Sequence, residues 1–565
     1  MNKKWEVCEC DEELVKKVAQ ENDIPELIAT ILVSRGITKK DEIKMFLEPT
    51  RHDFHDPFLM PDMEKAITRI LKSIETNEKI IIYGDYDVDG VTSITVLKKF
   101  LEDRGMTNVG YYIPKRLEEG YGLNKQAVKK IADEGYSLII TVDCGITGME
   151  EIAYAYELGM EVIVTDHHEP LDEIPDAIAV IDCKRKDSVY PCNVLAGVGV
   201  VFKLTQALSQ KLGLEEKEYL KYLDIVAVGT ISDIVPLVDE NRVISKLGLM
   251  LIAQTRNIGL KSLIKATTSV MSQVNVNTVS FAIAPRINAC GRIGHEIEAV
   301  NLFMTNNQQE AKELTEKLNT YNKTRQEIEK KIFEEAKEII ERENLQKNNT
   351  ITIGKEGWHH GVIGIVASKV TELYFKPAIL IGFEDDIGKG SGRSVPGFDL
   401  HNALCCASDT LMKYGGHEMA VGVTVERKKF KEFAETIEKK AKEEHTENIV
   451  PVISIDREIY PKDLTLKTIE DLMLLEPHGT SNPMPIFLIR NLKIDSIRTL
   501  VEGKHLKLTL QDSGNIINAI GFGLGHYAEE FMLGDRIDVI GTVELNVFNN
   551  IKNVQINMKD IRKSY

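Results

Sequence analysis

The residues most able to do chemistry begin with a run of carboxylates after a short apolar segment. Asp85, Asp87 and Asp89 stand at alternate positions shortly after the apolar run Ile80–Tyr83, and a helical pattern of apolar residues follows them. An apolar run of this length predicts a buried parallel strand, then a loop and a helix start. Three crowded carboxylates repel one another, and a bound cation would make the cluster favourable. A solvated acidic turn is the alternative for this stretch taken alone.

Polar side chains also close other predicted elements. Asp143 follows a second apolar run, Asp166, His167 and His168 close a third, and Asp233 follows an apolar helical pattern. Taken singly, Asp143 could be a helix cap, and His167 and His168 could belong to a polar loop. The ends of adjacent parallel strands meet at one edge of a sheet, so we expect these groups to converge on a metal site.

The predicted ligand set is rich in carboxylates, contains imidazole and lacks thiolate. This set suits Mn²⁺ or Mg²⁺ better than zinc, and the histidine favours Mn²⁺. More carboxylates are present than one ion needs, so two ions that share a bridging carboxylate are the economical arrangement. Two ions about 3.5–4 Å apart are a recurring arrangement for in-line displacement at phosphorus. The residues therefore predict phosphoester hydrolysis.

The elements that position these groups alternate between strand and helix from residue 79 to about residue 182, which predicts βαβ units and a mostly parallel sheet. A mainly helical stretch, a second α/β pattern and about five short strands follow, and the short strands suit an OB-like barrel. The expected fold class is multidomain α/β. The expected parts are an N-terminal helical segment (1–60), a catalytic domain with a mostly parallel sheet (61–240), a connector of long helices (241–345), a second α/β domain (346–448) and an OB-like nucleic-acid-binding barrel (449–565).

Composition limits the class of protein. A chain of 565 residues with 43% hydrophobic content has enough apolar material for several cores. The net charge of −17 disfavours phosphate contacts over the whole surface and by itself favours a small-molecule enzyme, although a local groove can have the opposite sign. The eight cysteines form no CxxC pair, so we expect neither a disulfide framework nor structural zinc. The N-terminus lacks a signal-like segment and no apolar run is long enough to span a membrane, which favours the cytoplasm.

Several basic segments are candidates for binding anions. Arg325 lies on the apolar face of a predicted long helix, where its guanidinium must either extend to solvent or meet an anion, and we favour the anion. Arg286 and Arg292 fall in a segment, 284–292, that we expect to be a loop. The segment 388–394 predicts a flexible basic loop that lacks the Walker A spacing. His417, in a glycine-rich run, would contact phosphate or fill the core.

The acidic motifs together with Asp166-His167-His168 resemble the DHH phosphoesterase superfamily, and the run 415–422 resembles its accompanying DHHA1 domain. The resemblance implies that His168 contacts the scissile phosphate or assists the leaving oxygen. It also implies support of the site by Asp85 and Asp166. Tyr83 stands where many relatives carry a further histidine, so the first ion would be weakly held, or completed by Asp85 or by waters. The implied ligands are Asp87 for one manganese, Asp89, His167 and Asp233 for the other, and Asp143 as the bridge.

The order of motifs, long helix and barrel resembles the exonuclease family of that superfamily that degrades single-stranded DNA from the 5′ end, in DNA repair and recombination. This resemblance implies release of 5′ mononucleotides by a monomer that works with a RecQ-type helicase and a single-strand-binding protein. A nanoRNase or cyclic-dinucleotide phosphodiesterase is the alternative, and a catalytically silent scaffold would have lost the ligands that are present here. The residues implied to contact DNA are Arg116, Tyr121, Arg286, Arg292, Arg325, His359, Ser391, Arg393 and His417.

Overall fold

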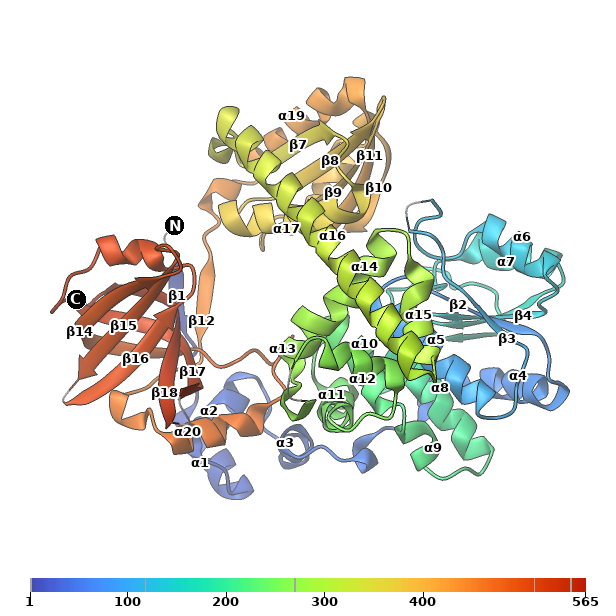
Figure 1. Ribbon diagram of the computed structural model, residues 1–565, viewed down its shortest axis with the longest axis horizontal. Coiled ribbons are helices and arrows are strands. Elements are labelled where there is room, and N and C mark those ends of the chain that lie inside the picture. The colour runs from blue at the N-terminus through green and yellow to red at the C-terminus, as the bar shows by residue number, and fades with distance from the viewer. Residues whose placement is uncertain (1–2, 117, 269–270, 513, 549–550, 565) are drawn as a thin grey trace. The chain divides into compact units, whose positions relative to one another are not determined.

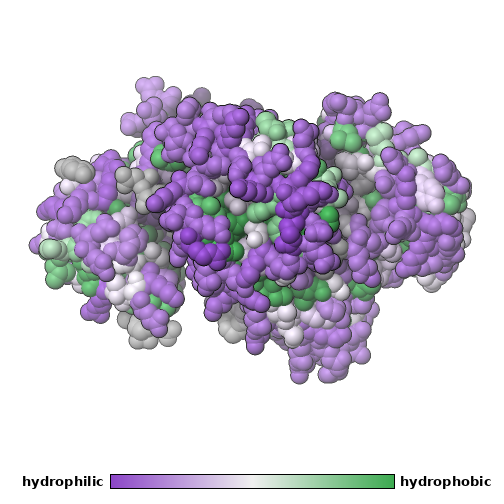
Figure 2. All heavy atoms as spheres, turned by 90° about the horizontal axis from the view of Figure 1, so that it is seen from above, coloured by the Kyte–Doolittle hydropathy of each residue, from purple (hydrophilic) through white to green (hydrophobic). Residues whose placement is uncertain are grey.

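The computed structural model describes residues 3–116, 118–268, 271–512, 514–548 and 551–564 (Figure 1). The chain forms two compact units. Unit 1 contains Met1–Phe54, Ile234–Leu247 and Val452–Tyr565, and unit 2 contains His55–Asp233 and Gly248–Pro451. Among the described residues, every helix is too short or too polar to cross a membrane. The face drawn in Figure 2 is mostly hydrophilic, with smaller apolar patches, which agrees with the charged content of 28%.

The first half of unit 2 is built on a five-stranded parallel sheet in the order β3-β2-β4-β5-β6. Strands β2 and β4 are fully buried, as expected for parallel strands covered on both faces, and this is why they appear in the sequence as continuous apolar runs. The expected parallel sheet is confirmed. Its strands are β2 (Ile80–Gly84), β3 (Val109–Tyr112), β4 (Leu138–Val142), β5 (Glu161–Thr165) and β6 (Ala179–Ile181), and its helices are α4 (Met63–Thr76), α5 (Val88–Glu102), α6 (Lys125–Asp133), α7 (Met149–Glu157) and α8 (Gly197–Lys211).

A helical region follows and ends in α16 (Gln308–Arg342), a helix of 35 residues. The segment 284–292, expected to be a loop, is helix α14 (Ala284–Arg292). Pro285 lies in its first turn, directly after a π-helical turn at Val279–Ile283. A Cβ at Gly291 would lie 2.7 Å from the carbonyl oxygen of Tyr86, so this glycine allows a close approach and does not mark a turn. The other helices here are α9 (Lys217–Leu220), α10 (Leu223–Ser232), α11 (Asp239–Ile252), α12 (Ile258–Lys265), α13 (Val276–Thr278) and α15 (Glu296–Met304).

The second α/β part of unit 2 has a five-stranded sheet in the order β10-β11-β9-β8-β7, in which only β7 and β8 are parallel. The segment 388–394, expected to be a flexible loop, lies almost wholly in the central strand β9 (Ile387–Arg393). A Cβ at Gly390 or Gly392 would lie 2.6 or 2.7 Å from a neighbouring side chain, so these glycines allow close packing on the sheet. The remaining elements are β7 (Ile351–Glu356), β8 (Ala378–Glu384), β10 (Leu411–His417), β11 (Ala420–Glu426), α17 (His360–Tyr374), α18 (Leu400–Cys406) and α19 (Phe430–Glu443).

Unit 1 contains the expected C-terminal barrel, which the pairing of β14 with β17 closes. Residues from both ends of the chain share its core, among them Val18, Ile28, Leu506 and Val539. The N-terminal strand β1 (Lys4–Val7) pairs in parallel with β12 (Val452–Ile455). Unit 1 also contains most of α11. Its other helices and strands are α1 (Glu12–Asn22), α2 (Glu26–Ser34), α3 (Lys40–Leu47), α20 (Leu466–Leu472), β13 (Arg457–Glu458), β14 (Phe487–Leu500), β15 (His505–Asp512), β16 (Asn515–Gly521), β17 (Arg536–Phe548) and β18 (Ile551–Lys563).

Candidate active site

The carboxyl ends of β2, β4 and β5 carry the predicted chemical groups at one edge of the parallel sheet. The strand register pairs Gly84 with Val142, and Val142 with Thr165. The residues that follow these three strand ends therefore emerge side by side, as expected for the ligand edge of an open α/β sheet. Asp233, which directly follows α10, also reaches this edge.

The structure brings the predicted ligands together in three overlapping groups. His167 Nε2 lies 3.1 Å from Asp143 Oδ1, 3.7 Å from Asp233 Oδ2 and 3.8 Å from Asp89 Oδ2. Asp143 belongs to two of the groups, and so it connects the two sides of the cluster. Within each group the candidate ligand atoms lie within 4.8 Å of one another: Asp85, Asp87 and Asp143; Asp89, His167 and Asp233; and Asp143, His167 and His168.

Two helix starts hold the carboxylates in place. Asp87 caps α5, and its Oδ1 accepts hydrogen bonds from the N–H groups of Asp89 at 2.9 Å and Gly90 at 3.1 Å. The carboxylate of Asp89 accepts from the N–H groups of Gly197 at 2.6 Å and Val198 at 2.7 Å, which begin α8. The helix dipole favours the negative charge at both positions.

Sequence reasoning missed Gly197. A Cβ on this residue would lie 2.7 Å from Asp143 Oδ1, so only glycine lets the start of α8 approach the cluster this closely. The only signal for it in the sequence is the glycine pair of Gly197-Val198-Gly199 just before a helical pattern, and that signal does not point to a carboxylate far away in the chain.

The electrostatics of the cluster call for cations. Burial, reinforced by the neighbouring Asp87, raises the pKa of Asp89 to about 7, and burial together with Asp89 raises the pKa of Asp233 to about 9. Burial and adjacent carboxylates also raise the pKa of Asp85 and of Asp143 well above the usual range. Such shifts show that the ionised carboxylates are unfavourable in this site without cations. Bound divalent ions would neutralise them and make the ionised forms favourable.

His167 has the properties of a neutral metal ligand. Burial, with the charge of His168 beside it, lowers the pKa of His167 to about 3, so the imidazole is neutral at physiological pH. Its Nε2 is buried and forms no hydrogen bond with any described residue. A buried lone pair aimed at carboxylates fits a bound cation, as does Oδ1 of Asp85, which is likewise buried and unpartnered within the described residues.

His168 is positioned at the rim of the cluster by Asp166. Its Nδ1 lies 2.7 Å from Asp166 Oδ1, and Tyr121 Oη lies 3.1 Å from the same nitrogen. Burial lowers the pKa of His168, but the hydrogen bond and charge of Asp166 outweigh it, so the net pKa is raised. The other oxygen of Asp166 accepts from the N–H of Ile146 at 2.9 Å, so this carboxylate is fully engaged in holding the site together.

Tyr83 is buried in the apolar layer that α6 and α7 share with the sheet. Its hydroxyl donates to the carbonyl oxygen of Gly122 at 3.0 Å and accepts from Nδ2 of Asn124 at 3.2 Å. Its ring stacks on Tyr112 at 5.3 Å. Tyr83 therefore secures the loop that carries Tyr121, and its hydroxyl is engaged away from the carboxylates.

A second group of predicted residues forms a basic cluster. Burial, and then the charges of Arg116, Arg325 and Arg393, lower the pKa of Arg292 to about 10, so three other guanidinium groups lie within electrostatic range of Arg292. Arg116 and His359 line an open pocket of about 430 Å³. Like charges at this density are stabilised by a bound anion.

The remaining predicted DNA contacts have partners within the protein. The guanidinium of Arg325 contacts Glu329 and donates to Asn322 Oδ1 at 2.6 Å. Arg286 donates to Asn319 Oδ1 at 2.6 Å and to the carbonyl oxygen of Ala282 at 2.6 Å. Ser391 Oγ accepts from Arg393 at 3.0 Å, and His417 is exposed at the end of β10.

The parallel sheet with its Asp- and His-rich edge, followed by a second α/β unit, defines a phosphoesterase of the DHH class. Models of the DHH family N-terminal domain, the DHHA1 domain and the RecJ OB domain match residues 79–230, 347–443 and 455–560. The chain belongs to the RecJ family, whose curated members are named single-stranded-DNA-specific exonucleases. This confirms the exonuclease family and the fold class expected from the sequence.

Individual relatives support the assignment along the whole chain. The RecJ exonuclease of Bacillus subtilis is 40% identical over 99% of this chain and 70% of its own length. That of Dickeya dadantii is 31% identical over 95% of this chain and 96% of its own length. The crystal structure of Thermus thermophilus RecJ in complex with Mn²⁺ matches with a TM-score of 0.86 and 29% identity, over 100% of this chain and 80% of that one.

Proposed function

We propose that the chain hydrolyses single-stranded DNA from its 5′ end and releases 5′ mononucleotides. The observation that carries the proposal is the position of Asp143, which groups with Asp85 and Asp87 on one side and with His167, a member of the Asp89 and Asp233 group, on the other. A carboxylate shared in this way suits a pair of divalent ions at a phosphodiester. The basic cluster of Arg116, Arg292, Arg325 and Arg393 supplies the complementary charge for DNA phosphates.

The ligand geometry fits two Mn²⁺ or Mg²⁺ ions, because every donor is a carboxylate or a neutral imidazole. Asp87 and Asp85 would hold the first ion, Asp89, His167 and Asp233 the second, and Asp143 both. The hydroxyl of Tyr83 donates to the carbonyl oxygen of Gly122, so it does not serve as a ligand of the first ion. Asp85 would supply that ligand instead. Bound ions would supply Lewis-acid stabilisation of the attacking and leaving oxygens.

The residues around the ions perform the remaining steps. Asp166 holds His168 and raises its pKa, so that His168 can carry a proton. When water adds to phosphorus and the P–O bond breaks, His168 donates this proton to the leaving 3′ oxygen. Tyr121 fixes the tilt of His168 through its hydroxyl, and its exposed ring is available to the terminal base.

Recognition of the 5′ end falls to the basic cluster. Arg393 is held by Ser391 and by the carbonyl oxygen of Gly392, and Arg292 by the carbonyl oxygen of Gly361. Fixed guanidinium groups bind phosphate oxygens with two parallel hydrogen bonds, so they would select a 5′ phosphate. Arg116, His359 and the exposed His417 extend this surface, whereas Arg286 and Arg325 would contact the backbone only by exchanging their protein partners.

We also propose a cellular setting for this activity. A monomer acting in the cytoplasm, where single-stranded DNA arises during repair and recombination, would need a helicase of the RecQ type to expose the strand. It would also meet a single-strand-binding protein on its substrate.

The experiment that tests the function is incubation of the full-length chain with DNA labelled at the 5′ or the 3′ end, single- or double-stranded, with Mn²⁺ or with chelator. We expect labelled mononucleotide from the 5′ end of the single strand only, and only with metal. Cleavage restricted to dinucleotides or cyclic dinucleotides would contradict the proposal and favour the phosphodiesterase alternative.

A further inference from the structure

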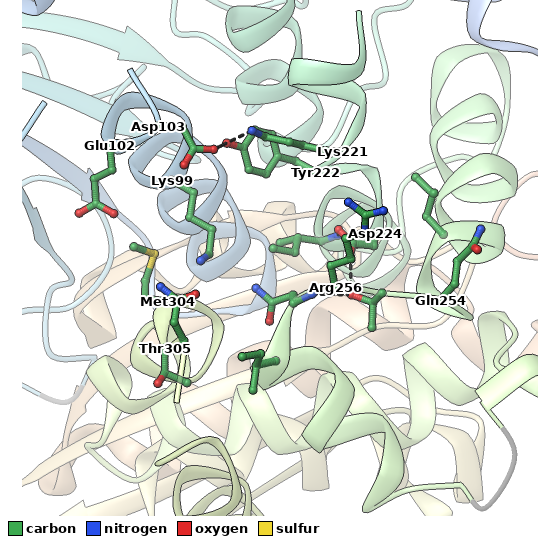
Figure 3. Close-up of a pocket in the computed structure, with 16 residues that line it drawn as sticks. Lys99, Glu102, Asp103, Lys221, Tyr222, Asp224, Gln254, Arg256, Met304 and Thr305 are labelled. Atoms are coloured by element: carbon green, nitrogen blue, oxygen red, sulfur yellow. Dashed lines mark hydrogen bonds and ion pairs between the residues drawn. The ribbon is translucent and has the colours of Figure 1, made fainter. Parts of the chain in front are cut away.

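Unit 2 contains a pocket of about 580 Å³ that is separate from the residues of the candidate active site (Figure 3). The C-terminal end of α5, the N-terminal end of α10 and the segments at 254–258 and 304–306 form its walls. This volume lies within the range of small-ligand sites.

Two cationic side chains of this pocket make no hydrogen bond or ion pair with a described residue, although the carboxylates of Asp103, Glu102 and Asp224 act on the charge of Lys99. Lys99, on α5, extends its amine into the pocket, and Arg256 lies on the opposite wall (Figure 3). Across the part of the chain that the structure describes, neither the amine of Lys99 nor the guanidinium of Arg256 makes a hydrogen bond or an ion pair. An unpaired ammonium that is partly desolvated is stabilised by a bound anion.

The acidic side chains of the pocket are already engaged. Asp103 accepts from Nζ of Lys221 at 2.7 Å and from the hydroxyl of Tyr222 at 2.7 Å. Asp224 accepts from the hydroxyl of Thr255 at 2.5 Å and from an N–H at 2.8 Å, and burial raises its pKa, which weakens its repulsion of an anion. Glu102, the third carboxylate of the pocket, accepts from Nζ of Lys98 at 2.7 Å. Each acidic side chain of the pocket therefore already has a donor within the protein.

The pocket also has an apolar wall. Ile225, Leu251, Ile258 and Met304 line it beside the polar groups. An apolar wall next to two cationic side chains matches a ligand that combines a flat organic ring with a phosphate.

We propose that this pocket binds a nucleoside monophosphate, with the phosphate at Lys99 and Arg256 and the base against the apolar wall. The choice of a nucleotide among organic anions rests on the proposed function, since hydrolysis would release nucleoside 5′ monophosphates. The site itself rests only on the geometry of the pocket.

The pocket is connected to the carboxylate cluster by two helices that pack together. α5 begins directly after Asp87 and ends at the pocket, and α10 begins at the pocket and ends next to Asp233. A ligand that contacts both helix ends would shift the relative position of the carboxylates at their other ends. Binding in the pocket therefore changes the rate of DNA hydrolysis.

Binding is tested by calorimetric titration of dAMP into the full-length chain carrying Asp143→Asn, in chelator, so that the metal centre takes no part. Lys99→Met and Arg256→Gln, each on this background, should weaken binding about tenfold or more, because a hydrogen bond to a charged group is lost. Lys265→Met, which removes an exposed charge at the end of the neighbouring helix α12, should bind dAMP as before. Melting curves confirm that the variants are folded.

The outcomes separate the alternatives. Unchanged dAMP affinity in both folded variants would overturn the pocket as the site, and equal affinity for inorganic phosphate would overturn the nucleotide. In a second arm, dAMP should alter the hydrolysis rate of the otherwise unmodified chain more than that of Lys99→Met, and an equal effect on both would overturn the coupling. If DNA is not hydrolysed at all while dAMP still binds, the proposed function fails and the pocket stands.

Discussion

At the scale of single residues, the site is defined by which side chains are already satisfied and which are not. Asp166 uses both of its oxygens on His168 and on backbone N–H groups. By contrast, Nε2 of His167 and Oδ1 of Asp85 are buried without a hydrogen-bond partner among the described residues. These two unpartnered atoms are available to a cation, whereas the carboxylate of Asp166 holds the site together.

Arg393→Ala tests recognition of the 5′ phosphate. Loss of a fixed guanidinium removes charge-assisted hydrogen bonds of about 1.5–3 kcal/mol, so KM for a 5′-phosphorylated strand should rise about ten- to a hundredfold. KM for the same strand with a 5′ hydroxyl should change little. Arg427→Ala, an exposed arginine of the same α/β part, is the matched control. An equal loss on both substrates would show that Arg393 does not read the phosphate.

Tyr83→Phe tests whether Tyr83 positions the loop that carries Tyr121. The substitution keeps the stacked ring and removes the hydroxyl that bonds Gly122 and Asn124. We expect kcat to fall about tenfold, a stability loss of about 1 kcal/mol and an unchanged affinity for Mn²⁺. Tyr111→Phe, which removes the hydroxyl bonded to Asn301 from the neighbouring strand, should leave kcat unaltered. A weaker Mn²⁺ affinity in Tyr83→Phe would instead point to a role as ligand.

At the scale of elements, the strand ends of the parallel sheet bring distant carboxylates together, and helix starts hold them. A partly buried ion cluster joins α4 to the opposite end of the sheet, where β2 and β5 begin. Arg69 donates to Glu78 at 2.7 Å and to Glu161 at 2.6 Å. The hydrogen bond from Arg69 outweighs burial and lowers the pKa of Glu78 to about 2.

The Glu78 carboxylate makes stability depend on pH. Its folded pKa is depressed from the model-compound value of 4.5, so its stabilisation is present above pH 4.5 and is lost as pH falls through about 2. Glu78→Gln should therefore lower the melting temperature at pH 7, corresponding to about 1–2 kcal/mol once solvent screening is allowed for. The difference from the unmodified chain should begin to shrink below pH 4.5. A difference that stays constant from pH 7 to pH 3 would refute this role.

The sequence predicts most of these elements because their signals are local. The strands before Asp85, Asp143 and Asp166 appear as short apolar runs, and the polar residue after each is visible in the chain. The role of Gly197 could not be predicted, because it depends on contact with carboxylates from other elements. Residues 284–292 and 388–394 were wrongly expected to be loops for a related reason: glycine normally breaks regular structure, and here Gly291 and Gly390 serve close packing that no local pattern reveals.

At the scale of the molecule, both ends of the chain build unit 1. Val18, Ile28 and Leu32 share the core of the barrel, so deleting residues 449–565 would expose apolar side chains. A loss of DNA binding in such a deletion could then not be distinguished from misfolding. The role of the barrel is better tested by substitution on its surface.

Phe522→Ala tests DNA binding by the barrel. Phe522 is 59% exposed, whereas Tyr527, another aromatic of the barrel, donates its hydroxyl to Asp560 and packs on the core. Loss of one stacking ring costs about 1–3 kcal/mol, so affinity for a long single strand should fall at least about fivefold. Affinity for a strand of only three nucleotides should not change. Leu545→Ala, an exposed apolar residue of the same barrel, is the control, and an equal effect of both substitutions would argue against stacking.

The most direct test of the central claim is the number of Mn²⁺ ions bound per chain, measured by equilibrium dialysis with elemental analysis. A shared Asp143 predicts about two ions on the unmodified chain and fewer than one on Asp143→Asn, because one carboxylate serves both positions. Asp172→Asn, at a fully exposed carboxylate, should retain both ions. Two ions on Asp143→Asn, or none on the unmodified chain, would contradict the account.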